Sequence, residues 1–300
     1  MKKALLPFAV LPVYALCDLY RFTFCRNRSI ISTLLLDKKT HAEDYYVRRD
    51  AAADRLRAKT HIRYSILSER GEELCGFYYP CGKRPSGKIA FIVHGYHSEH
   101  VETAGMLFEA YHERGFDVFT CDNTASGESG GRLFGYDLFE SEDCLKWLYF
   151  LINEFGVGIK VILHGFSLGG ATVLKMSDKC PPQVKFIVSD SGFISAGELL
   201  KSRLGIAYPL MEHVNRLIAG YKLSDTDVTE NVKAAKVPFF IVHGTEDPTV
   251  PFSMAPRIFA LCPEGSEKLF ADGARHIESI HNAPGEYLKT LDGMIEKYVK

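Results

Sequence analysis

Residues 165–170 have the sequence GFSLGG, in which Ser167 lies between two glycines. Of all segments in the chain, this one has the residue types best suited to nucleophilic catalysis. An apolar run precedes it at 161–163 and a helical stretch follows it at 171–176, which is the strand, turn and helix context of a nucleophile elbow. Such a turn is sharp, and bulk at either flanking glycine would collide with neighbouring backbone. We therefore predict that Ser167 is a nucleophile. The alternative is a serine that caps a helix in a glycine-rich turn.

A serine hydroxyl is a poor nucleophile at neutral pH, so a base must accept its proton. His276 lies in a loop after the last strand signal, and Asp247 lies in a loop after the preceding apolar run. The order serine, acid, histidine is the one expected when all three stand at the strand ends of one sheet. The sequence predicts His276 as the general base and Asp247 as the acid that orients it.

Other interpretations of the acid and the base remain open. Asp190 ends the run 184–188 and could reach the same rim, so it ranks second to Asp247, and Glu246 is a further rival. Asp247 could also be a turn or helix-cap residue before a proline, and His276 a surface-loop histidine.

The oxyanion of a tetrahedral intermediate needs hydrogen-bond donors. One should be the backbone N–H of Leu168, directly after the nucleophile. The second should come from the loop after the run 89–93, which reads HGYH at 94–97. We assign it to the backbone N–H of Tyr96, and expect the Tyr96 ring and the His97 side chain to line the pocket mouth.

The histidines His94, His97 and His100 have a spacing that could present metal ligands on one helical face. Gly95 and the end of a strand argue against a helix there, and no cysteine or carboxylate motif accompanies the histidines. We predict neither a metal nor a cofactor.

The elements that must position these residues form an alternating series. Short apolar runs occur at 89–93, 116–121, 159–163, 184–188, 237–242 and 268–270, with helical stretches between them, for example 137–154 and 252–262. Continuous apolar runs suit parallel strands covered on both faces. Residues 60–80 alternate around Gly71, as in an antiparallel hairpin. The sequence predicts an α/β protein with a mostly parallel, doubly wound sheet and an antiparallel N-terminal hairpin.

The predicted domain plan has two parts. Residues 1–58 form an apolar segment and a helical lead-in, and residues 59–300 form the α/β domain. Within that domain, residues from about 193 to 232 lack a strand signal but have helical spacing. An insertion there would form a small cap over a site at the strand ends, where ligands bind in such sheets.

Composition narrows the function classes. The 300 residues are 46% hydrophobic and carry a formal net charge of −1, so nothing suggests a nucleic-acid partner. None of the eight cysteines forms a C-x-x-C pair, and several lie in apolar runs. We interpret them as reduced thiols, which favours a cytoplasmic location. Pairing of Cys75 with Cys81 would require export, the less favoured alternative.

The N-terminus permits two interpretations. Lys2 and Lys3 precede the apolar run 4–16, as in a signal peptide or a short anchor. No small-x-small cleavage site follows, Asp18 interrupts the run before it reaches the roughly 20 apolar residues of a span, and two prolines weaken a helix there. The run is equally consistent with an apolar arm packed on the domain or lying at a membrane surface.

Several motifs together resemble those of the α/β-hydrolase superfamily, over roughly residues 60–300. Within it the chain is similar to the YqkD-like bacterial group of predicted serine hydrolases, near the cinnamoyl-esterase and acyl-peptidase-like branches. The motifs are His94-Gly95-Tyr96, Gly135-Tyr136 with Glu140 and Asp143, residues 165–170, 189–193 and 243–251, and Gly273-Ala274-Arg275-His276 with Ser279. The resemblance implies the α/β-hydrolase fold, esterase-type acyl transfer to water and, in many members, an N-terminal membrane segment.

One loop departs from the family pattern. The group often has D-x-R-G-x-G-x-S after the run at 116–121, whereas this chain has DNTASGES at 122–129. Thr124 replaces the arginine and Ala125 a glycine. The resemblance places this loop beside the oxyanion side of the pocket, so its charge and rigidity are in question.

The residues and the resemblance together predict a serine hydrolase that cleaves a carboxylic ester or thioester of a small acyl substrate through an acyl-enzyme. A peptidase or amidase with the same residues is the alternative. No propeller or acidic anchor for a free amino terminus is evident, which weakly favours esters. A non-catalytic binding protein would predict a broken set of residues, and dehalogenase chemistry would prefer aspartate at position 167. The acyl group and the oligomeric state do not follow from the sequence.

Overall fold

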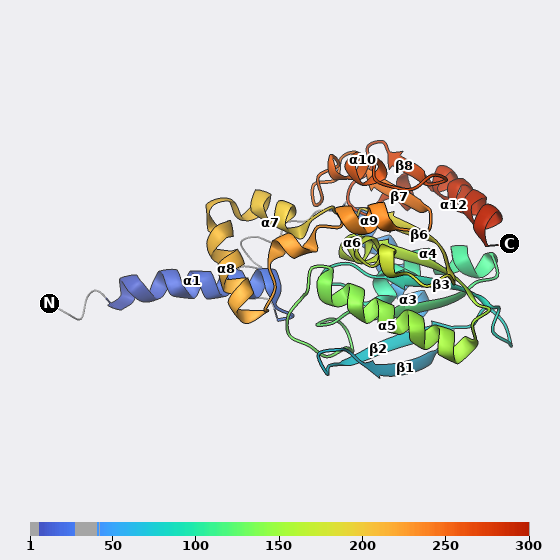
Figure 1. The fold of residues 1–300 in the computed structure, drawn as a ribbon, viewed down its shortest axis with the longest axis horizontal. Helices are drawn as coiled ribbons and strands as arrows, with labels where there is room; N and C mark the ends of the chain where they lie inside the picture. The colour runs from blue at the N-terminus through green and yellow to red at the C-terminus, as the bar shows by residue number, and fades with distance from the viewer. Residues whose placement is uncertain (1–5, 28–40, 42, 300) are drawn as a thin grey trace.

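The computed structural model describes residues 6–27, 41 and 43–299, and only the backbone of residues 6–13 and 43. Its centre is one eight-stranded sheet in the order β1-β2-β4-β3-β5-β6-β7-β8 (Figure 1). The strands are β1 Ile62–Leu67, β2 Glu73–Tyr79, β3 Lys88–Val93, β4 Asp117–Cys121, β5 Lys160–Phe166, β6 Val184–Asp190, β7 Phe239–Gly244 and β8 Glu267–Ala271. Strands β3 to β7 are buried almost throughout, which explains their continuous apolar runs.

The antiparallel part of the sheet is confined to its N-terminal edge. Strand β1 pairs with β2, and β2 pairs with β4, both antiparallel. Gly71 lies in the turn of the hairpin with a φ of 78°, a left-handed conformation that glycine adopts readily. All other pairs, from β4–β3 to β7–β8, are parallel. The predicted fold class is confirmed.

Helices cover both faces of the sheet (Figure 1). They include α3 Glu43–Arg57, α4 His100–Glu113, α5 Leu138–Phe155, α6 Leu168–Lys175, α10 Met254–Phe259, α11 Ser279–Asn282 and α12 Pro284–Tyr298. Trp147 of α5 and Val173 of α6 belong to one apolar core. Leu107 of α4 and Leu291 of α12 belong to another. Two cores on opposite faces make the sheet doubly wound, as predicted.

A helical insertion connects β6 to β7. It contains α7 Ala196–Leu204, α8 Tyr208–Ile218 and α9 Thr229–Ala234, with short 3₁₀ turns between them. These helices lie in the interval of about 193–232, and the role of that interval as a cap over the site stays a prediction. Helix α3 of the predicted lead-in packs tightly on α4, because a Cβ on Gly105 would lie 2.8 Å from the Ala52 carbonyl oxygen. The division at residue 58 stays a prediction.

Helix α1 extends over Leu6–Phe24 and projects from the body of the molecule beside α8 (Figure 1). The expectation that Pro7 and Pro12 weaken a helix here is wrong. Pro7 lies in the first turn, where no intrahelical partner is needed, and burial of Tyr20 and Phe24 anchors the other end. Residues 4 and 5 of the predicted apolar segment lie outside the described residues. Within the described residues, no helix is long and apolar enough to cross a membrane.

The eight cysteines are all free thiols in the structure. Cys75 and Cys81 are not bonded to each other, and the reduced state stays a prediction. Cys75 is buried, and its sulfur accepts a hydrogen bond from the Arg63 guanidinium. The three buried cysteines, Cys75, Cys121 and Cys144, act as packing residues.

Candidate active site

The turn between β5 and α6 holds Ser167 in a rare backbone conformation. Its φ of 54° and ψ of −115° place an L-residue in a region that costs conformational energy. The Ser167 N–H donates to the Asp190 carbonyl oxygen at 2.8 Å, which ties the turn to the end of β6. The strained turn presents the serine at the carboxyl edge of the sheet.

The glycines around Ser167 are required by close backbone contacts. A Cβ on Gly165 would lie 2.0 Å from the Gly169 carbonyl oxygen, and a Cβ on Gly169 would lie 2.2 Å from the Val93 carbonyl oxygen. Neither distance is compatible with a side chain. The steric reason inferred from the sequence motif therefore holds in the structure.

Alanine at position 169 should destabilise the fold. We expect Gly169→Ala to lower the free energy of unfolding by about 3 kcal/mol, because backbone must move to admit the new methyl group. Gly293→Ala is the matched control, since Gly293 is exposed within α12 and its Cβ would contact nothing within 4 Å. That change should stabilise by about 1 kcal/mol through helix propensity. Urea unfolding measures both, and an unchanged midpoint for Gly169→Ala would contradict the packing.

Ser167, His276 and Asp247 form a hydrogen-bonded chain. The Ser167 hydroxyl lies 2.8 Å from His276 Nε2, and His276 Nδ1 lies 2.7 Å from Asp247 Oδ2. An ionised carboxylate only accepts hydrogen bonds, so Nδ1 donates to Asp247 and Nε2 is left to accept from the serine. The structure thus brings together the three residues that the sequence singled out, although 109 positions separate the serine from the histidine.

His243 is a further contact of Asp247 that sequence reasoning missed. Its Nε2 lies 3.2 Å from Asp247 Oδ2, while the N–H groups of Thr249 and Val250 donate to Oδ1. Burial alone would raise the pKa of Asp247, but the hydrogen bonds and charges of His276 and His243 hold it well below its usual range. Asp247 is therefore ionised. The available signal was position, because His243 ends a strand directly before the Asp247 loop.

The rival acids lie elsewhere. Asp190 accepts hydrogen bonds from Ser191 at 3.0 Å and from the Tyr287 hydroxyl at 3.1 Å, and the Glu246 side chain is on an exposed residue. Neither contacts His276. Ser191 has a second contact, since its hydroxyl accepts from the Ile277 N–H at 3.0 Å. Asp190 thus supports the loop that carries His276 without touching the imidazole.

The buried carboxyl of Asp190 should make stability depend on pH. Burial raises its pKa from 3.8 to about 7, against hydrogen bonds from Ser191 and Tyr287 and the charge of His243. The folded state then binds more protons than the unfolded state between these two values, so the free energy of unfolding falls as the pH rises through that window. We expect Asp190→Asn to flatten this decline in urea titrations at several pH values. An equally steep decline would contradict the assignment.

The loop after β3 lies against the serine. A Cβ on Gly95 would be 3.2 Å from the Ser167 Cβ and 3.8 Å from its Oγ, so the backbone at Gly95 borders the hydroxyl. Leu168 is the first residue of α6, where amide groups lack intrahelical acceptors. Both backbone segments that should supply oxyanion donors thus adjoin Ser167.

The Tyr96 side chain differs from expectation. Its hydroxyl donates to the carbonyl oxygens of Phe22 and Thr23, at 2.8 and 2.7 Å, instead of lining a pocket mouth. These carbonyls belong to the last turn of α1, whose orphan acceptors Tyr96 satisfies. Helix α1 therefore buttresses the loop that borders Ser167, a contact between distant segments that local sequence patterns do not reveal.

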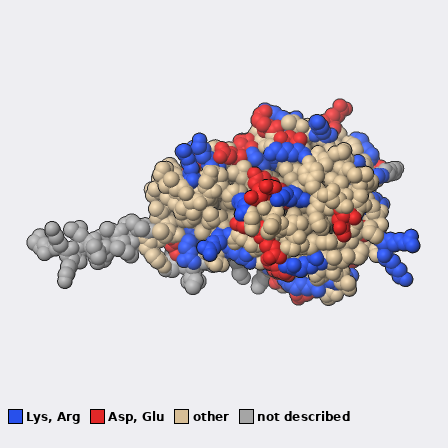
Figure 2. Space-filling view, turned by 60° about the horizontal axis from the view of Figure 1, so that its bottom comes forward, with Lys and Arg blue, Asp and Glu red and all other residues tan. Residues whose placement is uncertain are grey.

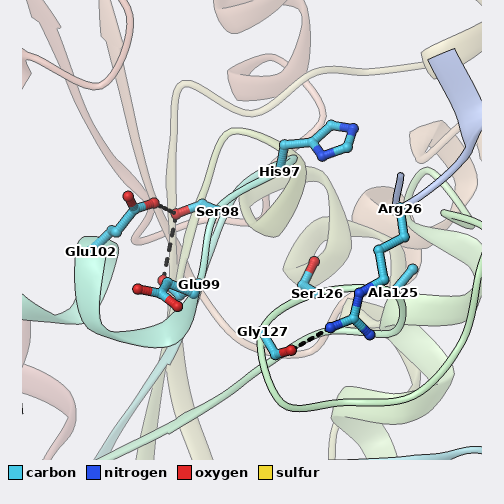
Figure 3. A pocket seen from close by; sticks show the side chains of 8 residues that line it. All are labelled: Arg26, His97, Ser98, Glu99, Glu102, Ala125, Ser126 and Gly127. Atoms are coloured by element: carbon cyan, nitrogen blue, oxygen red, sulfur yellow. Dashed lines mark hydrogen bonds between the residues drawn. The ribbon is translucent and has the colours of Figure 1, made fainter. Parts of the chain in front are cut away.

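A pocket of about 270 Å³ opens beside the same loop (Figure 3). Its lining is polar and comprises Arg26, His97, Ser98, Glu99, Glu102, Ala125, Ser126 and Gly127. His97 lines this pocket, whose lining includes none of Ser167, Asp247 and His276, so its predicted place at the mouth of the active site stays a prediction. The Arg26 guanidinium donates to the Gly127 carbonyl, and the Ser98 hydroxyl donates to Glu102 at 2.7 Å. The pocket is thus a polar neighbour of the loop at residues 94–97.

The loop that departs from the family pattern keeps a guanidinium nearby. Arg70 of the hairpin turn donates to the Thr124 hydroxyl and to Asp143, each at 2.9 Å. Thr124 in turn hydrogen-bonds Asp143. Arg70 also lies over the Phe139 ring, 4.2 Å from its centroid. The positive charge absent at position 124 is therefore supplied from a different strand pair.

His94, His97 and His100, which are close together in the sequence, have different surroundings in the structure. His94 is buried and bonds the Asn123 N–H through Nε2, whereas His100 bonds Asp122. In the described part of the chain, no group of three or more histidine, cysteine or acidic side chains could hold a metal ion. His94 is a structural residue of the β3 end.

A family model matches residues 107–272, more than half of the chain. The chain belongs to the prolyl oligopeptidase family. The prolyl oligopeptidase match contains Ser167 and Asp247 and ends four positions before His276. Family and fold together place the chain among the hydrolases.

Individual relatives agree with this family. The chain is 23% identical to the uncharacterised protein YqkD of Bacillus subtilis over 243 residues, covering 78% of each chain. It superposes on the esterase Pf2001 of Pyrococcus furiosus with a TM-score of 0.67 and 19% identity, covering 81% of this chain and 94% of the other. The esterase domain of a Rhodothermus marinus protein gives a TM-score of 0.58 at 18% identity, covering 80% and 100%. The α/β-hydrolase fold and the YqkD-like resemblance are confirmed.

Proposed function

We propose that this chain is a serine hydrolase that cleaves carboxylic esters or thioesters through an acyl-enzyme. The observation that carries the proposal is the chain of two short hydrogen bonds, from Ser167 through His276 to the ionised Asp247. A hydroxyl placed this way can transfer its proton to the imidazole while it attacks a carbonyl carbon. The strained turn holds Ser167, a partly exposed residue, at the carboxyl edge of the sheet.

The proposed reaction has two halves. In the first, Ser167 Oγ bonds to the carbonyl carbon, His276 takes the hydroxyl proton, and the N–H groups of Leu168 and Tyr96 receive the oxyanion. His276 then protonates the leaving alcohol or thiol as its bond to the carbonyl breaks. In the second half, water gives a proton to His276 as its oxygen bonds to the acyl carbon. His276 then returns that proton to Ser167 Oγ as the bond between Oγ and the acyl carbon breaks and the acid leaves. Asp247 holds the histidine tautomer and stabilises the imidazolium throughout.

Amide cleavage by the same residues is the second candidate, favoured by membership of the prolyl oligopeptidase family. An amine leaves less readily than an alcohol, so an amidase must protonate the leaving nitrogen as its bond breaks. The polar pocket beside residues 94–97 offers charged groups for a peptide as well as for a polar ester. Direct comparison of ester and amide substrates separates the two.

Hydrolysis of p-nitrophenyl esters of graded chain length, beside aminoacyl p-nitroanilides, tests the proposal. We expect turnover of the esters, with the preferred length reporting the size of the acyl site. The full chain should be used, because Tyr20 and Phe24 are buried and Thr23 bonds Tyr96. Turnover confined to the anilides would establish the amidase, and turnover of neither class would contradict the proposal.

A further inference from the structure

The end of the molecule formed by α1 and α8 exposes large apolar side chains. Met211 and Asn215 occupy the buried stripe of α8, as expected for a surface helix. A second stripe on the opposite side is also apolar. Leu210 is 50% exposed and Leu217 is 72% exposed, seven residues apart on one face of α8, and Ile206, in the 3₁₀ turn directly before α8, is fully exposed. A helix in water would carry polar residues at these positions.

Neighbouring residues extend this surface. We define the docking face as the exposed apolar side chains Tyr14, Ile206, Leu210, Leu217 and Ile218. Helix α1 contacts α8 along this end, and Tyr20 of α1 bonds Asn215 of α8 at 3.3 Å. The two helices are thus held as one surface. Residues 6–17, which belong to α1, include no charged residue.

The border of the docking face is positively charged. Within residues 201–222, Lys201, Arg203, Arg216 and Lys222 are exposed, and the one acidic residue of that range, Glu212, is partly buried. On α1, Arg21 is exposed while Asp18 is buried. Figure 2 shows mostly uncharged side chains at this end of the body, with basic and some acidic side chains along its edge. An apolar face bordered by cations matches a surface of acyl chains below anionic headgroups.

We propose that the docking face binds the surface of a membrane containing anionic lipid. The uncharged part of α1 spans 12 residues, about 18 Å of helix, against a hydrocarbon core of about 30 Å. It therefore enters one leaflet at most. A symmetric pair of chains is a poorer occupant, because a two-fold interface would bring the same cationic border against itself.

Docking would bring the helical insertion to the lipid. That insertion joins β6 to β7, the strands that end at Asp190 and just before Asp247, so the bound protein would place its candidate active site near acyl substrates. This consequence rests on the proposed function, whereas the docking itself does not. The test is therefore binding and not turnover.

Flotation with phosphatidylcholine vesicles, with and without phosphatidylglycerol, tests the proposal on the full chain. We expect binding to the phosphatidylglycerol vesicles that weakens in high salt and on phosphatidylcholine alone. Leu210→Glu/Leu217→Glu should reduce the partition coefficient on the order of 100-fold. Both side chains are exposed, so the melting temperature should stay unchanged. Leu67→Glu/Val157→Glu is the matched control, since these exposed apolar residues lie outside the docking face and binding should persist.

Three results would overturn the proposal. The first is the absence of vesicle binding by the wild type. The second is equal binding by Leu210→Glu/Leu217→Glu, which would assign lipid binding to the N-terminal run alone. The third is a concentration-dependent dimer in gel filtration that this variant abolishes without any vesicle binding, which would make the face a contact between copies.

Discussion

Ser167→Ala should abolish ester turnover while the fold stays intact. We expect kcat to fall on the order of 10⁶-fold, the scale seen when a triad nucleophile is removed. Alanine meets the same backbone restriction at a φ of 54° that serine meets, so the free energy of unfolding should change little. Steady-state hydrolysis of the preferred p-nitrophenyl ester measures the loss.

A second variant, Ser167→Gly, separates the catalytic role of the serine from the backbone strain at position 167. Ser167→Gly should lose activity equally, yet gain about 1 kcal/mol in the free energy of unfolding, because glycine adopts positive φ without steric cost. Urea unfolding reports the gain. Activity in either variant near that of the wild type would remove Ser167 from the reaction, whatever the stability result.

Asp247→Asn should reduce kcat about 10⁴-fold, far more than Asp190→Asn. Asparagine at position 247 can donate a hydrogen bond to His276 Nδ1, which favours the tautomer whose Nε2 carries the proton and cannot accept one from serine. Asp190 contacts Ser191 and Tyr287 but not His276, so its replacement should act mainly on stability. Kinetics on both variants, normalised to folded protein, give the ranking. The reverse ranking would move the acid to Asp190.

The contact of Asp247 with His243 bears on the expected effect of Asp247→Asn. His243 Nε2 lies 3.2 Å from the carboxylate and 3.1 Å from the Val250 carbonyl oxygen, and its residue is almost fully buried. An asparagine at position 247 would still meet His243 on one side. The kinetic loss is therefore expected to come from the His276 tautomer and the missing charge, not from collapse of the loop.

Much of this site could be predicted from the sequence because its signals are local. The glycines at 165 and 169 mark a turn whose packing excludes side chains, and each continuous apolar run marks the strand that delivers the next residue to the same edge. The chain order then left few candidates for base and acid. Asp247 and Asp190 both end near strand termini, and only their side-chain contacts distinguish them.

The features that could not be predicted from the sequence depend on contacts between segments that are distant in the chain. Tyr96 bonds Phe22 and Thr23 across more than 70 positions, and Arg70 reaches Asp143 across 73. No periodicity encodes such pairs. Helix α1 could not be predicted for another reason. Pro12 disfavours a helix locally, but burial of the last turns of α1 in the fold outweighs that preference.

The most direct test of the central claim is mass spectrometry of the full chain after treatment with a fluorophosphonate, which reacts with activated serine hydroxyls. The account predicts one covalent adduct, located on Ser167 in the digested protein, and a large loss of labelling rate in His276→Ala, since the imidazole no longer accepts the proton. An adduct on another residue, or ester turnover by wild-type protein that leaves Ser167 unmodified, would contradict it.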